Sequence, residues 1–464
     1  MQNSDMLKKR LDSLRSEVLR IVKPSAAEIK NFTALADQVM ARIREAAPRN
    51  VGIILAGSVA RGTQVRGSSD IDIFLLFPKT LEERRMEFKG VNIAKSIVRK
   101  GAGEHMVIKY AEHPYVQLVF DDLGINVDIV PAYKISKASE KGSAVDRTQL
   151  HNAFVNNNLS EYQKDDVRVL KTFLKEHNIY GAEAKVGGFS GYLCELLIYH
   201  YGTFYEFISR MSNLSLPTVI IPRERVSLDL GSSAEYAKKF NSRFIVIDPT
   251  DKERNVAANV SVESLSRLVL AARRLATDPS HKNFFAARYS EIDTSAKLSK
   301  IAKFLEADMY VLELATKDIA EDIIWQQTSR LRQRIEQLLS KSHFDPIFSL
   351  QGISDSEALI AFFINRISMG AAQHEGPSVF MGSASERFAR AHHKDLLFIK
   401  EDRLVAITKA DFKTPRALIT AFIKNSREIF PSYISKKGAR LYVNKLDEAH
   451  AKIIYRSYIE KFSF

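Results

Sequence analysis

The hydrophobic pattern divides the first third of the chain into helical and strand-like segments. Residues 6–47 carry apolar side chains at helical spacing, and Pro24 interrupts them, so we predict two helices. Shorter apolar runs of strand length follow at 51–55, 71–77, 116–120 and 125–130. Helical or turn segments separate these runs, which predicts a mixed α/β domain that ends near residue 155.

Helical spacing dominates the next segment, from Ser160 to about residue 280. Ser160 and Gln163 match a capping box in front of an amphipathic helix. The remaining residues mix strand-like runs with helices, and we find no internal repeat. We therefore expect an α+β multidomain protein with a head, a helical neck, a C-terminal α/β body and a helical basic tail, divided as 1–155, 156–280 and 281–464.

Composition and charge narrow the class of protein. Of the 464 residues, 45% are hydrophobic and 27% are charged, which excludes collagen-like, low-complexity and wholly disordered chains. The 68 Lys and Arg against 55 Asp and Glu give a net charge of +13, which favours a polyanionic partner. Residues 412–464 hold 11 basic and 4 acidic side chains, with tyrosines among them. This segment is either a solvated face over a core or a surface that follows a nucleic-acid backbone.

The cellular setting follows from cysteine usage and hydropathy. The single Cys194 cannot form an intramolecular disulfide or a cysteine zinc site, and its apolar neighbours predict a buried thiol. The N-terminus lacks the apolar core of a signal peptide, and no stretch approaches the ~20 apolar residues of a membrane span. We expect a cytoplasmic protein without membrane contact; the oligomeric state stays open, with a homodimer as one option.

The residues that indicate chemistry begin with two acids on a predicted strand. Asp70 and Asp72 are two positions apart, so their side chains share one face, about 7 Å apart along the strand at ~3.3 Å per residue. Ile71 and Ile73 point the other way. Asp128 is the lone carboxylate in the run 125–130, and a neighbouring strand could bring it alongside. Clustered carboxylates need a cation, and their hard oxygens suit Mg²⁺.

A glycine–serine turn precedes this strand. Gly57 and Ser58 follow an apolar strand and open a short helix, where free backbone N–H groups favour phosphate. The Ser58 hydroxyl and the Arg61 guanidinium add donors. By itself the pair is an ordinary turn. Together with the acids about a dozen residues downstream, it indicates a nucleotidyltransferase.

At this point the sequence resembles a known family. Gly57-Ser58, Asp70-x-Asp72 and Asp128 resemble the DNA polymerase β-type nucleotidyltransferase superfamily, and more closely the archaeal-type (class I) CCA-adding enzymes. Further segments in family order are 110–115, 130–133, 179–183, 188–197 and 254–259. The resemblance implies a polymerase β-like head that adds C, C and A to the 3′ end of tRNA from CTP and ATP. It also implies that the neck completes the nucleotide pocket and that the C-terminal body and tail bind tRNA.

The resemblance also implies residue roles. Asp70, Asp72 and Asp128 would hold two Mg²⁺ ions; many relatives carry Glu at the first position, so metal geometry at Asp70 is less defined. Contacts to the triphosphate would come from Ser58, Arg61, Thr148, His151, Lys171 and Tyr180. Arg254 would read the base of CTP or ATP. Read without the family, Thr148 is a helix cap, His151 a surface residue, Lys171 a solvated helix position and Tyr180 a core residue, and Arg254 pairs with the acids next to it.

Two alternatives remain at this stage. A related polymerase or oligoadenylate synthase would add only AMP, and a catalytically inactive relative would only bind RNA. The three intact acids argue against the inactive relative, because an RNA-binding surface does not need clustered negative charge. We also interpret His113 as a structural hydrogen-bonding residue, since the sequence shows no partner ligands for a zinc site.

Overall fold

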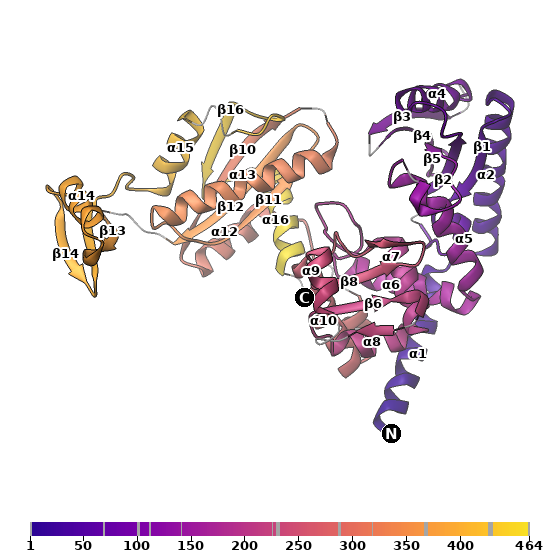
Figure 1. The fold of residues 1–464 in the computed structure, drawn as a ribbon, viewed down its shortest axis with the longest axis horizontal. Helices are drawn as coiled ribbons and strands as arrows, with labels where there is room; N and C mark the ends of the chain where they lie inside the picture. The colour runs from indigo at the N-terminus through magenta and orange to yellow at the C-terminus, as the bar shows by residue number, and fades with distance from the viewer. Residues whose placement is uncertain are drawn as a thin grey trace. The chain divides into compact units, whose positions relative to one another are not determined.

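The structure is a computed structural model, and it describes residues 2–67, 70–99, 103–110, 113–140, 142–224, 226–228, 233–285, 289–317, 319–365, 370–425 and 430–462. The polar turn expected at Ser68 and Ser69, and residues 111–112 of one family segment, lie outside this set. The chain forms two compact units, residues 1–287 and 288–463 (Figure 1). Each unit is described by itself.

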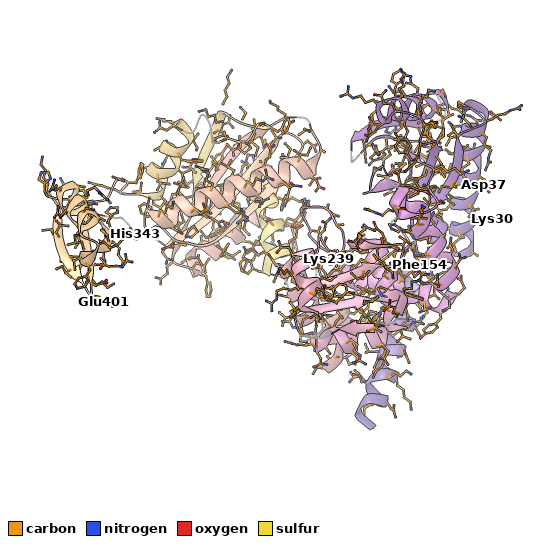
Figure 2. The ribbon with its side chains drawn as sticks, in the orientation of Figure 1. Lys30, Asp37, Phe154, Lys239, His343 and Glu401 are labelled. Atoms are coloured by element: carbon orange, nitrogen blue, oxygen red, sulfur yellow. The ribbon has the colours of Figure 1, made fainter. Side chains whose placement is uncertain are left out.

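Two long helices open the first unit, as the spacing predicts. α1 (Gln2–Val22) ends just before Pro24, and α2 (Ala26–Ala46) begins after Ser25, which forms a capping box with Glu28. Lys30 and Asp37 lie on the exposed side of α2 (Figure 2). Its other side is buried, because apolar residues recur there at helical spacing.

A five-stranded sheet forms the core of the head. Its order is β1-β2-β5-β4-β3, and β2 and β5 are its parallel pair. The strands are β1 (Gly52–Ala56), β2 (Asp70–Phe77), β3 (Glu104–Tyr110), β4 (Pro114–Phe120) and β5 (Ile125–Tyr133). The sequence predicts four of these; β3 is the one it misses. α2 and α4 (Glu83–Ser96) cover the face that carries Ile71, Ile73 and Leu75. The opposite face begins with the acidic residues.

Short elements complete the head. α3 (Gly57–Arg61) lies between β1 and β2, and α5 (Thr148–Asn158) packs against β1 and α3. Two single-turn 3₁₀ helices, η1 (Ala138–Glu140) and η2 (Val145–Arg147), connect β5 to α5. These connections bring residues near 60 and near 150 together.

The rest of the first unit is helical with one small sheet. α1 packs against α6 (Glu161–Glu176), and both share a core with α7 (Gly191–Tyr201), α8 (Phe204–Ser212), α10 (Val262–Thr277) and α11 (His281–Phe284). Ser160 caps α6 through the predicted capping box with Gln163. Cys194 is buried in this core, as predicted, and burial raises the pKa of its thiol to about 12.

A small sheet lies within this region, which the sequence predicts to be mostly helical. Its order is β7-β6-β8-β9, with α9 (Ala234–Phe240) packed against β8. The strands are only three to five residues long: β6 (Thr218–Ile221), β7 (Val226–Leu228), β8 (Phe244–Asp248) and β9 (Asp251–Asn255). A 3₁₀ turn, η3 (Pro222–Glu224), follows β6. Strands this short, one of them mostly charged, carry no readable alternation.

The second unit contains a four-stranded sheet with helices on both faces. Its order is β11-β12-β10-β16. The strands are β10 (Ala307–Thr316), β11 (Pro346–Ile353), β12 (Glu357–Asn365) and β16 (Ile434–Val443). α13 (Glu321–Lys341) and α15 (Pro415–Asn425) pack on one face, and α12 (Thr294–Phe304) and α16 (Glu448–Phe462) pack on the other. The segment expected as a helical tail therefore contributes β16 to this sheet.

A smaller sheet follows within the same unit. β13 (Ala371–Ser378), β15 (Arg403–Lys409) and β14 (Leu396–Lys400) pair in that order, with η4 (Val379–Met381) and α14 (Ser383–Ala391) after β13. Among the helices of the described residues, none combines the length and the apolar character that crossing a bilayer requires.

Candidate active site

Two neighbouring parallel strands carry the acidic residues. β2 and β5 pair in a register that sets Asp72 opposite Asp128, and Asp70 opposite Asn126. Ile71, on the other face of β2, is fully buried, so the three carboxylates leave the sheet on the face away from α2 and α4. The register thus places side by side the acids that the sequence singles out.

These acids line a cavity of about 480 Å³ in the first unit. Six of the ten residues that the sequence assigns to the site are among its lining: Ser58, Asp70, Asp72, Asp128, Lys171 and Tyr180. The lining combines residues from the head with residues from α6 and the segment that follows it. The cavity is therefore bounded by carboxylates at one side and by a lysine and a tyrosine at another.

The carboxylates perturb one another. Burial first, and then the neighbouring charges of Asp128 and Asp70, raise the pKa of Asp72 to about 6 against the opposing effect of Arg61. Burial also raises the pKa of Asp128, against a hydrogen bond of 2.8 Å donated by Gln117. Carboxylates held close together in this way favour either a proton or a cation.

The carboxylates are near one another without forming a closed ligand group. Asn126 donates a hydrogen bond of 3.0 Å to Asp70, which stays exposed. Among the residues that the structure describes, the three aspartates do not bring their ligand atoms within 4.8 Å of one another. Their oxygens nonetheless form the hard, anionic donor set that Mg²⁺ prefers, and they share one cavity.

The glycine–serine turn lies against the acidic strand. Gly57 has a φ of +69°, and a Cβ added there would lie 1.8 Å from Oδ2 of Asp72. Only glycine allows the turn to approach the carboxylate so closely. Ser58, the next residue, lines the cavity.

The Arg61 guanidinium is already hydrogen-bonded to other side chains. It is buried and donates to Glu195 (3.0 Å from Nε) and to Asn152 (2.9 Å from Nη1). Arg61 does not line the cavity. Sequence reasoning missed Glu195, although a lone acid in the apolar run 191–197 indicates a buried charge that needs a partner.

Glu195 also links Arg61 to Lys171. The fully buried Glu195 carboxylate accepts a hydrogen bond of 2.6 Å from Thr63 and lies 3.9 Å from Nζ of Lys171. Lys171 Nζ donates to the carbonyl oxygen and hydroxyl of Thr63, at 3.0 and 3.1 Å. Burial lowers the pKa of Lys171, and Glu195 opposes that effect. Burial raises the pKa of Tyr180, which also faces the cavity.

His151 and Arg254 belong to a second group of side chains around Asp248. His151 is buried, stacks on Tyr192 with ring centroids 3.8 Å apart, and places Nε2 3.1 Å from Asp248. Arg254 donates to the same carboxylate from Nη1 at 2.9 Å. The alternative reading of Arg254 paired it with acids next to it in the sequence; its partner here is Asp248, six residues away.

The remaining expected residue lies apart from these contacts. Thr148 is the first residue of α5 and is half-buried, and it does not line the cavity. His151 follows one turn later, and burial lowers the pKa of its imidazole. The structure thus brings together six residues at the cavity and two around Asp248, with Arg61 and Thr148 outside both groups.

His113 has the partners that the sequence does not show. It is buried, and its Nδ1 lies 2.8 Å from Glu87 and 3.6 Å from Glu83, both on α4. The interpretation as a hydrogen-bonding residue agrees with this placement. The stated absence of partner ligands is wrong, because these three residues bring their ligand atoms within 4.8 Å of one another.

Family models match three segments of the chain in order. They are the nucleotidyltransferase domain (residues 37–151), the second domain of tRNA nucleotidyltransferase (165–285) and the C-terminal domain of the CCA-adding enzyme (307–436). With the sheet and the acidic strand pair, these matches define the chain as a nucleotidyltransferase.

Similar proteins narrow the class further. The chain is 32% identical to the CCA-adding enzyme of Methanocaldococcus jannaschii, over 93% of this chain and 95% of that protein. It is 31% identical to the CCA-adding enzyme of Archaeoglobus fulgidus, over 89% and 90% of the two chains. The chain belongs to the family of CCA-adding enzymes.

A solved structure described as a cytoplasmic RNA terminal U-transferase is more distant. It is 16% identical, with a TM-score of 0.45, over 61% of this chain and all of that chain.

Proposed function

We propose that this chain adds C, C and A in succession to the 3′ end of tRNA, from CTP and ATP, with release of pyrophosphate and without a nucleic-acid template. The observation that carries the proposal is the register of β2 and β5, with Asp72 opposite Asp128 at a cavity that Ser58 and Lys171 also line. Family membership supplies the substrate.

Three carboxylates are proposed to hold the metal. Asp70, Asp72 and Asp128 offer the donor set, and the raised pKa of Asp72 and Asp128 reflects burial together with neighbouring negative charge, which a cation would offset. When bound, two Mg²⁺ ions supply a lowered pKa for the tRNA 3′-hydroxyl and neutralise the pyrophosphate that departs.

The other site residues are proposed to bind the nucleotide. Ser58, Lys171 and Tyr180 face the cavity and would contact the triphosphate, with Thr148 and His151 at its phosphate side. Arg61 would act on the triphosphate without lining the cavity, because Glu195 and Asn152 already hold its guanidinium. Arg254 would read the base, since its planar fork of donors suits base-edge acceptors.

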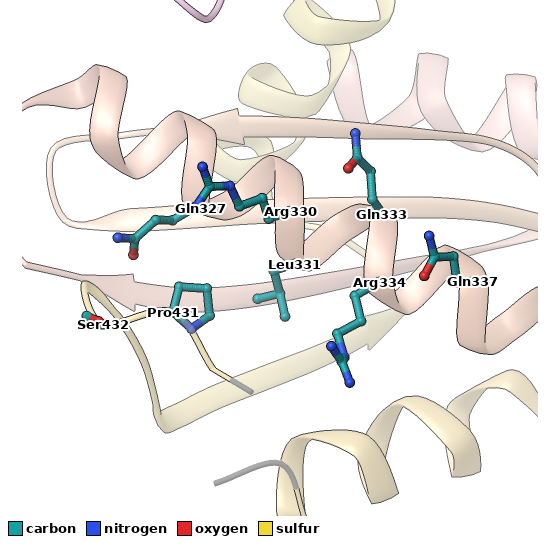
Figure 3. A pocket seen from close by; sticks show the side chains of 8 residues that line it. All are labelled: Gln327, Arg330, Leu331, Gln333, Arg334, Gln337, Pro431 and Ser432. Atoms are coloured by element: carbon teal, nitrogen blue, oxygen red, sulfur yellow. The ribbon is translucent and has the colours of Figure 1, made fainter. Parts of the chain in front are cut away.

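The C-terminal unit offers a surface for tRNA on α13. Arg330, Gln333, Arg334 and Gln337 are exposed along this helix (Figure 3). Within the described residues, neither arginine has an ion-pair partner, so both guanidinium groups stay available to phosphate. We propose that this face contacts the tRNA backbone by charge and shape.

The domain division and setting complete the proposal. Residues 1–155 would form the catalytic head, 156–280 the neck that completes the nucleotide pocket, and 281–464 the tRNA-binding body and tail. The enzyme would work in the cytoplasm without membrane contact. Sedimentation of the whole chain tests whether it is a homodimer.

Incorporation assays test the function. The substrates are tRNAs lacking one, two or three terminal nucleotides, each supplied with a single labelled nucleoside triphosphate and Mg²⁺. We expect CMP on the tRNAs lacking three and two nucleotides, and AMP on the tRNA lacking one. Addition of AMP alone to all three would favour the AMP-adding polymerase. Binding of tRNA with no incorporation would favour the inactive relative.

A further inference from the structure

The group around Asp248 contains a buried carboxylate that the proposed mechanism does not use. Asp248 is the last residue of β8, is fully buried, and does not line the acidic cavity. Five hydrogen-bond contacts nevertheless converge on its two oxygens. Hydrogen bonds from His151 and Thr250 outweigh the effect of burial and hold the pKa of Asp248 below its usual range. The carboxylate is therefore ionised at neutral pH.

The two oxygens of Asp248 have different partners. Oδ1 accepts from the backbone N–H and the hydroxyl of Thr250, at 2.9 and 2.7 Å, and from Tyr192 at 3.2 Å. These contacts close the turn between β8 and β9 and tie it to α7. Of the residues that the structure describes, only His151 and Arg254 donate to Oδ2, at 3.1 and 2.9 Å. Oδ1 thus stabilises the local fold, and Oδ2 orients two residues of the proposed nucleotide site.

The Oδ2 contact fixes part of the Arg254 guanidinium and leaves the rest open. Arg254 donates from Nη1, and its side chain is 30% exposed. In the described part of the chain, Nε and Nη2 of Arg254 make no hydrogen bond. Because the guanidinium is planar, anchoring one nitrogen sets the plane in which the other donors lie. The free edge can then meet a base without first losing rotational freedom.

The same oxygen sets the proton on His151. A carboxylate oxygen only accepts, so the 3.1 Å contact requires the proton on Nε2. Nε2 with a proton cannot accept from Arg254, although the two nitrogens are 3.3 Å apart. His151 and Arg254 therefore both donate to Asp248 rather than to each other. The stack of His151 on Tyr192 holds the plane of the imidazole ring.

We propose that Asp248 is a positioning residue that determines nucleotide selectivity, by holding Arg254 and His151 through Oδ2. The proposal rests on the proposed function, in which Arg254 reads the base. It predicts that selectivity depends on a buried carboxylate that touches neither the nucleotide nor the metal.

The test compares two isosteric variants of buried carboxylates. Asp248→Asn keeps an oxygen for the Thr250 turn but puts an NH₂ group where Oδ2 meets two donors. Asp166→Asn is the matched control, since Asp166 is also fully buried and is held by Arg15 and by the backbone N–H of Phe204. Thr250→Ala is a second control, because it removes a donor to Oδ1 and leaves the Oδ2 contacts intact.

The readout is the ratio of kcat/KM for the correct over the incorrect nucleotide on each truncated tRNA, with inhibition by inorganic tripolyphosphate measured alongside. We expect Asp248→Asn to lower the ratio about tenfold or more, mainly through KM. Inhibition by tripolyphosphate should weaken less than the ratio falls, because His151 is only one of the proposed triphosphate contacts, and both controls should keep the ratio. Arg254→Ala should lower the selectivity ratio by the same factor. The double variant Asp248→Asn/Arg254→Ala should have the same ratio as Arg254→Ala alone.

Unchanged selectivity in a folded Asp248→Asn would overturn the proposal, as would an equal loss in Asp166→Asn or a fully additive double variant. Should Asp248→Asn not fold by circular dichroism, Asp248→Glu keeps the charge but displaces the carboxylate. It is expected to lose selectivity in the same direction, and full selectivity there also overturns the proposal. Failure of the wild-type chain to add CMP to tRNA would overturn the proposed function and this inference together.

Discussion

The sheet of the head and the sheet of the C-terminal body differ in how completely their two faces are covered. The body sheet packs α13 and α15 on one face and α12 and α16 on the other, and both faces are apolar. The head sheet packs α2 and α4 along one face, whereas its other face carries Asp70, Asp72 and Asp128 at a cavity and buries only a small apolar cluster further along β2. A face that is open at one end can place charged groups on a rigid support, whereas a sheet covered along both faces leaves interaction surfaces to the outer sides of its helices.

The largest expected effect lies at the acidic residues of the head sheet. Asp72→Ala should lower kcat for CMP and AMP addition by about 10³-fold or more, because a metal ligand contributes several kcal/mol to the transition state. Affinity for tRNA, measured by filter binding, should change little. The control is Asp37→Ala, which removes the same charge from the exposed side of α2. Full activity in Asp72→Ala would contradict the metal assignment.

Substitutions on the covered faces should affect stability instead. Ile73→Ala in the head and Leu312→Ala in the body each truncate a fully buried side chain, at an expected cost of about 2–5 kcal/mol. Urea unfolding of each variant measures the loss. A loss below about 0.5 kcal/mol at either position would show that the face is not packed as described.

The raised pKa of Asp72 predicts that the stability of the head depends on pH. Its value of about 6 lies above the ordinary 3.8, so the folded state binds the proton more tightly than the unfolded state. Without divalent cations, the free energy of unfolding should be highest below pH 4 for this group and fall by about 3 kcal/mol as the pH rises through 6. Asp72→Asn should flatten this slope, and Mg²⁺ should reduce it in the wild type. An identical slope in wild type and variant would refute the assignment.

The smallest effect is expected on the outer side of α13. Arg334→Ala should weaken tRNA binding a few-fold and reduce the slope of log K against log salt by about 1. Lys30→Ala, on the exposed side of α2, removes the same charge from the first unit and should leave the slope nearly unchanged. Equal slopes in wild type and Arg334→Ala would exclude this face as a phosphate contact.

Local signals account for the parts of the fold that were predicted correctly. Pro24 and Ser25 mark the boundary between α1 and α2, and Ser160 marks the start of α6, because caps and proline act over a few residues. The sheet β7-β6-β8-β9 was missed, since its strands are short and β9 is mostly charged. β16 was missed within a segment rich in basic residues, where its pairing with β10 is a long-range contact.

The sequence by itself determined which residue types could perform the chemistry: alternation along β2 separates Asp70 and Asp72 from the buried isoleucines, and a glycine before Ser58 permits the close turn. Tertiary structure alone decided the partners. Asp128 meets Asp72 through a strand register, Glu195 takes Arg61 from 134 residues away, and Asp248 joins His151 to Arg254. Periodicity reports which way a side chain faces, but a buried charge is paired only by the fold that removes it from water.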